Sequence, residues 1–333
     1  MKDKHKIKAA IVLLFVLTAA VCFLSVAVGA KHISLSDVIS SLTGGNVEPF
    51  TKAVIMQRLP RTVFALIAGA ALAVSGALMQ AITRNPVADP GILGVNTGAS
   101  LFVVAGMALF NIADATQYIF LALAGAGITA VLVYGIASIG KSGATPLKLS
   151  LSGAAVSTAL SSLVSTLLIP NNSVMNNFRF WQTGSVGGAL WDKIILLSPF
   201  FIIGITIAIF LIPSLNAMAL GDEMASSLGV NTTLTRILGA CAGVMLCGAT
   251  TALAGPIGFV GLMVPHAVRL ILGNNMSRII PFSIICGAIL LVCCDVIGRI
   301  IQSSGELEVG IVTAFLGAPV FIAIIRSTKV RSL

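Results

Sequence analysis

Runs of about twenty apolar residues, separated by short polar segments, are the main pattern along this chain. A helix of that length crosses the hydrocarbon core of a bilayer, whereas a membrane β-barrel would show short alternating segments instead. The runs predict ten membrane-spanning helices, over residues 9–30, 62–82, 92–112, 117–139, 147–169, 192–213, 233–254, 257–272, 279–301 and 309–326. The expected fold is therefore an all-α integral membrane protein, with residues 1–333 forming one polytopic domain.

The apolar run over residues 9–30 follows a basic segment over residues 2–8, an order that is typical of a secretory signal peptide. Val28 and Ala30 would then provide the small residues of a cleavage site. The run is longer, however, than the about 7–15 apolar residues of such a peptide. We therefore interpret it as a first membrane span that the protein retains.

Composition agrees with a membrane protein. Of the 333 residues, 57% are hydrophobic and only 9% are charged, and the mean hydropathy is +1.05. These values lie far outside the range of soluble domains. The six cysteines all fall within apolar runs, where we interpret them as small buried hydrophobic residues. No histidine or second cysteine pair stands at metal-ligand spacing, so we expect neither a metal site nor a cofactor.

The net charge of +9 indicates how the chain is oriented. Lysine and arginine are retained on the cytoplasmic side during insertion. With the N-terminus inside, thirteen of the twenty basic residues fall at cytoplasmic ends, namely Lys2, Lys4, Lys6, Lys8, Arg84, Lys141, Lys148, Arg236, Arg269, Arg278, Arg326, Lys329 and Arg331. We expect a multi-pass protein of the cell membrane with both termini in the cytoplasm, and no nucleic-acid partner.

The longest hydrophilic interval on the cytoplasmic side covers residues 213–236. It predicts two short helices, over 214–220 and 222–228, with Gly221 and Gly229 as their stops and Asp222 as an N-cap. Small residues such as Ala225 would let another protein approach closely. A plain solvated connector is the alternative interpretation. Most other connections are far shorter, which favours a docking partner.

A stripe of small and hydroxyl-bearing residues follows one face of the fifth predicted span. Its members recur every three or four residues: Ser150, Gly153, Ser157, Ser161 and Ser165. Serine can simply bond the carbonyl one turn back, and small residues favour helix packing. The alternative is that this face lines a passage, because a weakly polar wall without charge lets a large solute pass without holding it.

Two arginines, Arg58 and Arg61, bracket Pro60 on the predicted outer side, and Pro60 suits the first turn of the next helix. Cationic anchoring at lipid headgroups is one interpretation of this pair. Farther along, Asp295 and Arg299 stand one helical turn apart and predict an ion pair near the outer edge of the ninth span. Between residues 33 and 42, helical spacing with a polar side predicts a short surface helix.

Two segments imitate nucleotide-binding motifs. Residues 135–142 match the phosphate-loop pattern, and the apolar run that ends at Asp295 resembles a Walker B strand. A working phosphate loop follows a strand and opens a helix. Here the first segment ends an apolar helix and the second lies within a span, so we do not expect this chain to bind nucleotide.

Two Gly/Pro breaks resemble each other, one within residues 76–95 and one within residues 248–270. The helices that lead into them would run in opposite directions across the membrane. This predicts inverted-topology repeats, in which the second to fifth spans would superpose on the seventh to tenth.

Five stretches together resemble the FecCD-type permeases, which are membrane subunits of ABC importers for iron-siderophores, haem and cobalamin. They are RLPRT, GAALAVSGALMQAITRNPVADPGILGVNTGAS, GDEMASSLGV, AGPIGFVGLMVPHAVRL and ELEVGIVTAFLGAPVFIAII. No single stretch is decisive, but their order and spacing make the match highly specific.

The resemblance implies a ten-helix subunit of the type II importer fold, paired two-fold with itself or a related permease. Two cytosolic ABC ATPases would dock below it and an extracytoplasmic solute-binding protein above it. By resemblance, the ATPase-coupling residues are Asp222, Glu223, Ala225, Leu228 and Gly229. The residues that dock the binding protein would be Arg58, Arg61 and Arg299, and the serine stripe would line the pathway.

The expected function is therefore transport without catalysis, with ATP hydrolysis on separate subunits. An iron-siderophore complex is the most frequent cargo of the family, and haem or cobalamin are the alternatives. An ion-coupled secondary transporter is the alternative from another class, because such carriers also use inverted repeats and broken helices.

Overall fold

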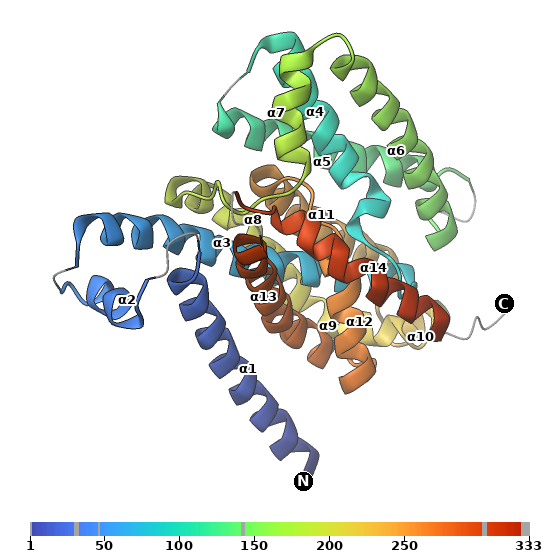
Figure 1. Ribbon diagram of the computed structural model, residues 1–333. Coiled ribbons are helices and arrows are strands. Elements are labelled where there is room, and N and C mark those ends of the chain that lie inside the picture. Colours follow the sequence, from blue (N-terminus) through green and yellow to red (C-terminus); the bar gives the residue numbers. More distant parts are fainter. Residues whose placement is uncertain are drawn as a thin grey trace.

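The computed structural model describes residues 2–29, 33–45, 47–112, 114–140, 144–301 and 305–327, and throughout these residues the regular structure is helical (Figure 1). The helices are α1 (Lys2–Ala27), α2 (Leu35–Leu42), α3 (Pro49–Thr83), the 3-10 helix η1 (Pro90–Leu93), α4 (Val95–Phe110), α5 (Ala115–Ala137), α6 (Pro146–Leu168), α7 (Asn172–Gln182), α8 (Trp191–Phe210), α9 (Ile212–Met218), α10 (Asp222–Ser227), α11 (Thr232–Ala254), α12 (Val260–Leu272), α13 (Met276–Ile301) and α14 (Val309–Ser327).

Within the described residues, seven helices are long and apolar enough to cross a membrane: α1, α3, α5, α6, α8, α11 and α13. Three shorter apolar helices, over Val95–Phe110, Val260–Leu272 and Val309–Ala323, fall on the remaining predicted spans. The prediction of an all-α membrane fold is confirmed. The short helix expected between residues 33 and 42 is also present as α2, with Ser34 as its N-cap.

The central helix of the bundle is α3, and 83% of the residues in its most apolar 18-residue stretch are buried. Small residues let its backbone touch its neighbours. A Cβ atom on Gly76 would overlap the carbonyl oxygen of Gly261 in α12, and one on Gly69 would overlap that of Gly287 in α13. The contacts of α3 with α12 and α13 therefore depend on pairs of glycines that face each other between the helices.

The start of α3 differs from the prediction, because Pro60 does not open this helix. The helix begins at Pro49, eleven residues earlier, and Pro60 lies in its interior. The extra turns persist because Ile55 is fully buried in a small apolar cluster of its own, formed with Val26, Ala27, Ile33 and Val38 from α1, α2 and the segment between them. These first turns of α3 project with α2 from one side of the bundle (Figure 1).

Both predicted Gly/Pro breaks are present. The first break runs from Arg84 to Gly94, and these two end residues have a positive φ. The second break runs from Gly255 to Phe259. They lie together, because a Cβ atom on Gly261 would stand 3.3 Å from Asp89 Oδ2. Irregular backbone at membrane depth is tolerated where protein surrounds it, as it does here. The superposition of the two halves stays a prediction.

Candidate functional site

The first candidate site is the α9–α10 element, residues 212–229. The two short helices predicted at 214–220 and 222–228 are present, with α9 beginning two residues earlier than expected. Gly229, with a φ of 80° that favours glycine, follows the C-cap Leu228 and ends α10 as predicted, whereas α9 already ends at Met218 with Ala219 as its C-cap, before Gly221. The prediction that Asp222 is the N-cap of α10 is wrong: Asp222 is the first residue of the helix, and Gly221 is its N-cap.

The carboxylate of Asp222 ties this element to the bundle. Its Oδ1 accepts from Arg84 Nη2 at 2.5 Å, and its Oδ2 accepts from Arg236 Nη2 at 2.7 Å. Arg84 ends α3 and also donates to the carbonyl of Met218 in α9 at 2.8 Å. One acidic residue therefore links the end of α3, both short helices and the start of α11, which holds the element in a fixed position.

In contrast to Asp222, which is tied to the bundle, several apolar side chains of the α9–α10 element are exposed on the protein surface. Leu220, Met224 and Leu228 are 67%, 55% and 62% exposed, and Glu223 is also exposed beside them. Ala225 corrects one expectation, since it is fully buried and cannot form part of an approachable surface. It packs α10 against the bundle instead. The exposed surface combines small residues, Ala219, Ser226 and Ser227, with the larger apolar ones.

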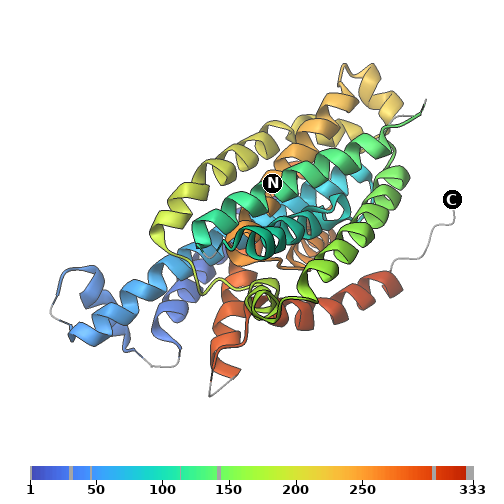
Figure 2. The same cartoon turned by 90° about the horizontal axis from the view of Figure 1, so that it is seen from above.

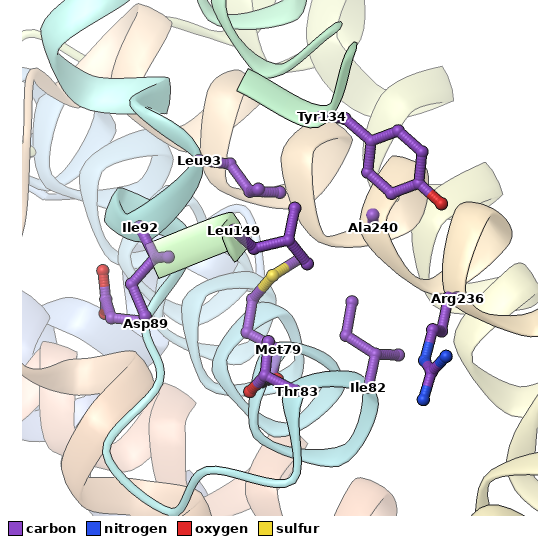
Figure 3. A pocket seen from close by; sticks show the side chains of 10 residues that line it. All are labelled: Met79, Ile82, Thr83, Asp89, Ile92, Leu93, Tyr134, Leu149, Arg236 and Ala240. Atoms are coloured by element: carbon purple, nitrogen blue, oxygen red, sulfur yellow. Dashed lines mark hydrogen bonds between the residues drawn. The ribbon is translucent and has the colours of Figure 1, made fainter. Parts of the chain in front are cut away.

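A small cavity lies between the end of α3, η1, α5, α6 and the start of α11 (Figure 3). Its volume is about 10 Å³, room for no more than about one water molecule, so it is not a solute site. Asp89 and Arg236 lie on opposite sides of it. Asp89 accepts from the backbone N–H of Gly91 at 2.8 Å. Sequence reasoning assigned Asp89 no role, although an aspartate before Pro-Gly is a turn-capping signal.

The second candidate site is an arginine cluster around Asp295. Arg61 Nη2 lies 2.8 Å from Asp295 Oδ1, and Arg299 Nη2 lies 2.9 Å from Asp295 Oδ2. Arg61 also reaches Glu306 at 2.6 Å. The predicted pair between Asp295 and Arg299 is confirmed. Its third member, Arg61, comes from a helix more than 200 residues away in the sequence, which spacing cannot reveal.

Two arginines of this group also hold the end of α1. Arg299 Nη1 donates to the carbonyls of Ser25 at 2.7 Å and Val28 at 3.1 Å, and Arg58 Nη1 donates to that of Val26 at 2.8 Å. The last carbonyls of a helix lack partners within it and favour positive charge. Arg299 is only 4% exposed, so in this conformation it acts inside the protein. Arg58 and Arg61 lie nearer the surface.

The serine stripe of α6 divides into a packed part and an exposed part. A Cβ atom on Gly153 would overlap the carbonyl oxygen of Ile92, so at Gly153 the helix packs against η1. Ser150 and Ser157 are half-buried. Ser161 and Ser165 are exposed, and Ser165 Oγ bonds the Ser161 carbonyl one turn back at 3.0 Å. The contact at Gly153 and the bond of Ser165 agree with the packing interpretation, and the role of this face as a pathway wall stays a prediction. The exposed face also carries Thr158, Ser162 and Thr166.

The segments that imitate nucleotide sites adopt helical structure. Gly135 lies inside α5, with helix rather than strand before it, and Asp295 lies inside α13. Lys141 and Ser142 fall outside the described residues. Where the segments are described, neither has the strand that its motif requires.

Comparison with known proteins identifies the family of this chain. The model of the FecCD transport family matches residues 17–327. The Fe(3+)-citrate import system permease protein YfmD of Bacillus subtilis (strain 168) is 45% identical over 306 residues, covering 92% of this chain and 91% of YfmD. The ferric enterobactin transport system permease protein FepD of Escherichia coli (strain K12) is 40% identical over 317 residues, covering 95% of this chain and 93% of FepD.

A solved structure has a similar fold. It is described as an inward-facing conformation of a metal-chelate type ABC transporter, and it matches with a TM-score of 0.82 and 27% identity over 94% of this chain and 97% of that chain. The similarity thus extends over nearly the whole length and is not confined to one motif. This chain belongs to the FecCD transport family.

Proposed function

We propose that this chain is the permease subunit of an ABC importer and forms the pathway for an iron-siderophore complex delivered by an extracytoplasmic binding protein. Support for the cargo comes from YfmD and FepD, whose names specify ferric citrate and ferric enterobactin. Haem or cobalamin would use the same mechanism. The chain itself performs no chemistry, because two cytosolic ATPase subunits supply the energy.

The main support for the proposal comes from the exposed surface of the α9–α10 element. An apolar surface of Leu220, Met224 and Leu228 stands exposed on an element that Asp222 fixes to two long helices. An exposed apolar group rimmed by polar residues is typical of a protein interface. We infer that an ATPase subunit docks on this surface. Closure of the ATPases would then move α10 as a rigid lever and pass the movement into α3 and α11.

At the other end of α3, the arginine cluster is the proposed dock for the binding protein. Arg58 and Arg61 lie nearer the surface and would meet acidic residues of that protein. Arg299 is buried beside Asp295, so we assign it to positioning Arg61 and the end of α1. Opposite charges at such an interface raise the association rate and fix the orientation.

The hydroxyl-rich face of α6 is the proposed pathway wall. Ser161 and Ser165 are exposed. Only 17% of the residues in the most apolar 18-residue stretch of α6 are buried. A second permease subunit, either a copy of this chain or a relative, would face them across a two-fold axis. Hydroxyls without charge would let a large chelate pass without a deep binding well.

Transport by reconstituted proteoliposomes tests the proposal. Ferric chelate uptake should require this chain, the ATPase subunits, the binding protein and ATP together. Uptake by this chain alone, driven by an ion gradient, would instead establish a secondary transporter. Quenching of the binding protein's fluorescence by ferric siderophores, haem and cobalamin would identify the cargo. In oriented vesicles, labelling at both termini should occur only from the cytoplasmic side.

A further inference from the structure

A cavity of about 360 Å³ lies beside the α9–α10 element and shares only Arg84 with the interactions described above. Three segments form its walls: the end of α3, α9 with its C-cap, and the stretch from the end of α12 to the start of α13. The lining residues that matter here are Gln80, Arg84, Ala219, Arg269 and Asn274. The volume is within the range of about 300–1,000 Å³ that is typical of sites for small molecules.

Arg269, in the last turn of α12, brings a charge without a counter-ion to this cavity. Its side chain is half-buried, and among the residues that the structure describes no carboxylate pairs with it. Withdrawing a cation from water is costly unless an anion compensates it. An arginine in this position is therefore suited to a ligand that brings negative charge.

Two further groups complete the lining. Gln80 is 2% exposed; its Nε2 donates to the Leu262 carbonyl at 3.2 Å, while its Oε1 has no hydrogen-bond partner among the described residues. Arg84 uses only Nη2 for its bonds to Met218 and Asp222. A guanidinium group has five N–H donors, so those on Nε and Nη1 of Arg84 remain available to a ligand.

We propose that this cavity binds a phosphate group, held between Arg269 of α12 and Arg84 of α3. Arginine pairs with phosphate through parallel N–H donors, and two guanidinium groups from different helices suit an anion with several oxygens. Gln80 Oε1 would accept from a hydroxyl of the ligand. The phosphate belongs either to the headgroup of an anionic phospholipid or to a free anion. This site goes beyond the proposed transport function, because its occupancy does not depend on ATP or on cargo.

Binding by the purified full-length chain tests the proposal. In phosphatidylcholine nanodiscs, calorimetric titration with pyrophosphate measures the free anion, and native mass spectrometry of detergent-purified chain measures retained phosphatidylglycerol. At least one probe should bind saturably. Binding of phosphatidylglycerol alone assigns a lipid headgroup, and binding of pyrophosphate alone assigns a soluble anion.

Variants connect that binding to the cavity. Arg269→Gln should weaken it at least about tenfold, the effect of losing one charge-assisted contact. Arg278→Gln removes an exposed arginine that does not line the cavity and should leave binding unchanged. Ala219→Trp fills the cavity from an exposed position and should also abolish binding, which decides the matter if Arg269→Gln fails to fold. Absence of saturable binding by both probes, or unweakened binding by both cavity variants, overturns the proposal.

Discussion

Two carboxylates, Asp295 and Asp222, each accept from two arginines, but they differ in their surroundings. The Asp295 side chain is 2% exposed and that of Asp222 is 43% exposed. A buried ion pair contributes little net stability when intact, but removing one partner leaves the other charge buried without compensation. An exposed pair is screened by water, so losing it costs much less. The same arrangement therefore makes Asp295 a determinant of stability and Asp222 chiefly a positional link.

Asp295→Asn should destabilise the protein strongly. Arg61 and Arg299 would keep their charges in a buried site without the carboxylate, at a cost of about 3–5 kcal/mol. Glu306→Gln is the matched control, because this side chain is 44% exposed and its loss should cost about 1 kcal/mol or less. Unfolding of the purified protein in mixed micelles measures both. Equal midpoints for the two variants would contradict the importance of the buried cluster.

At the scale of elements, the bundle depends on how closely α3 approaches α12 and α13. In lipid, helix association relies on packing and hydrogen bonds because lipid tails are as apolar as the side chains. Facing glycines bring the backbones into contact. Residues 62–82 are rich in glycine and alanine, but only the structure shows which glycine meets which neighbour.

Gly76→Ala tests this packing. The added methyl group would overlap the backbone of Gly261, which cannot move aside as a flexible side chain can, so the variant should be destabilised by about 1–3 kcal/mol. Gly127→Ala in α5 is the control, because no atom lies within 4 Å of the position of its Cβ. Alanine favours a helix over glycine by up to about 1 kcal/mol, so the control should be neutral or stabilised. Thermal unfolding in detergent would separate the two, and an unaffected Gly76→Ala would refute the close approach.

The exposed surface of α10 gives a prediction about coupling. Met224→Glu places a charge in the proposed ATPase interface, and ATP-driven uptake should fall at least about tenfold while the protein still folds and inserts. Ser227→Ala is the control, because its hydroxyl only bonds the Glu223 carbonyl one turn back. Bulky replacement of Glu223 should act like Met224→Glu. A bulky residue at Gly229 is less decisive, since the positive φ there adds backbone strain. Normal uptake by Met224→Glu would refute the coupling role.

At the scale of the whole molecule, the two candidate sites lie far apart along one helix. Arg61 and Arg84 are 23 residues apart in the sequence, and α3 runs through Arg61 to end at Arg84, so its rise separates them by about 35 Å. Figure 2 shows the α9–α10 element and the α2 arm at opposite ends of the bundle. A movement at α10 can therefore reach the arginine cluster through a single rigid element.

Charge reversal at the opposite end tests docking of the binding protein. Arg61→Glu and Arg58→Glu should weaken its binding to the reconstituted permease, and the loss should be greatest at low salt, where charges are least screened. Lys52→Glu, at an exposed position earlier in α3, is the control for a general change of surface charge. Surface plasmon resonance at two salt concentrations measures the effect. Unchanged affinity at low salt would assign the arginines to lipid anchoring instead.

The sequence by itself determined the class of the protein, the approximate positions of its apolar spans and the two short helices within residues 213–236. These depend on local properties, because an apolar run must match the thickness of the bilayer, and a glycine just after a short helix favours the positive φ that ends it. The pair of Asp295 and Arg299 was predictable for the same reason, since residues one turn apart on a helix are neighbours.

Only the tertiary structure decided which side chains from distant helices meet. It added Arg61 to the Asp295 cluster, buried Ala225, packed Gly153 against η1 and placed Arg269 in the wall of a cavity. It also moved the start of α3 to Pro49, because a separate apolar cluster supports the extra turns. Periodicity gives the faces of one helix, but the rotation and partners of that face follow from packing among all the helices.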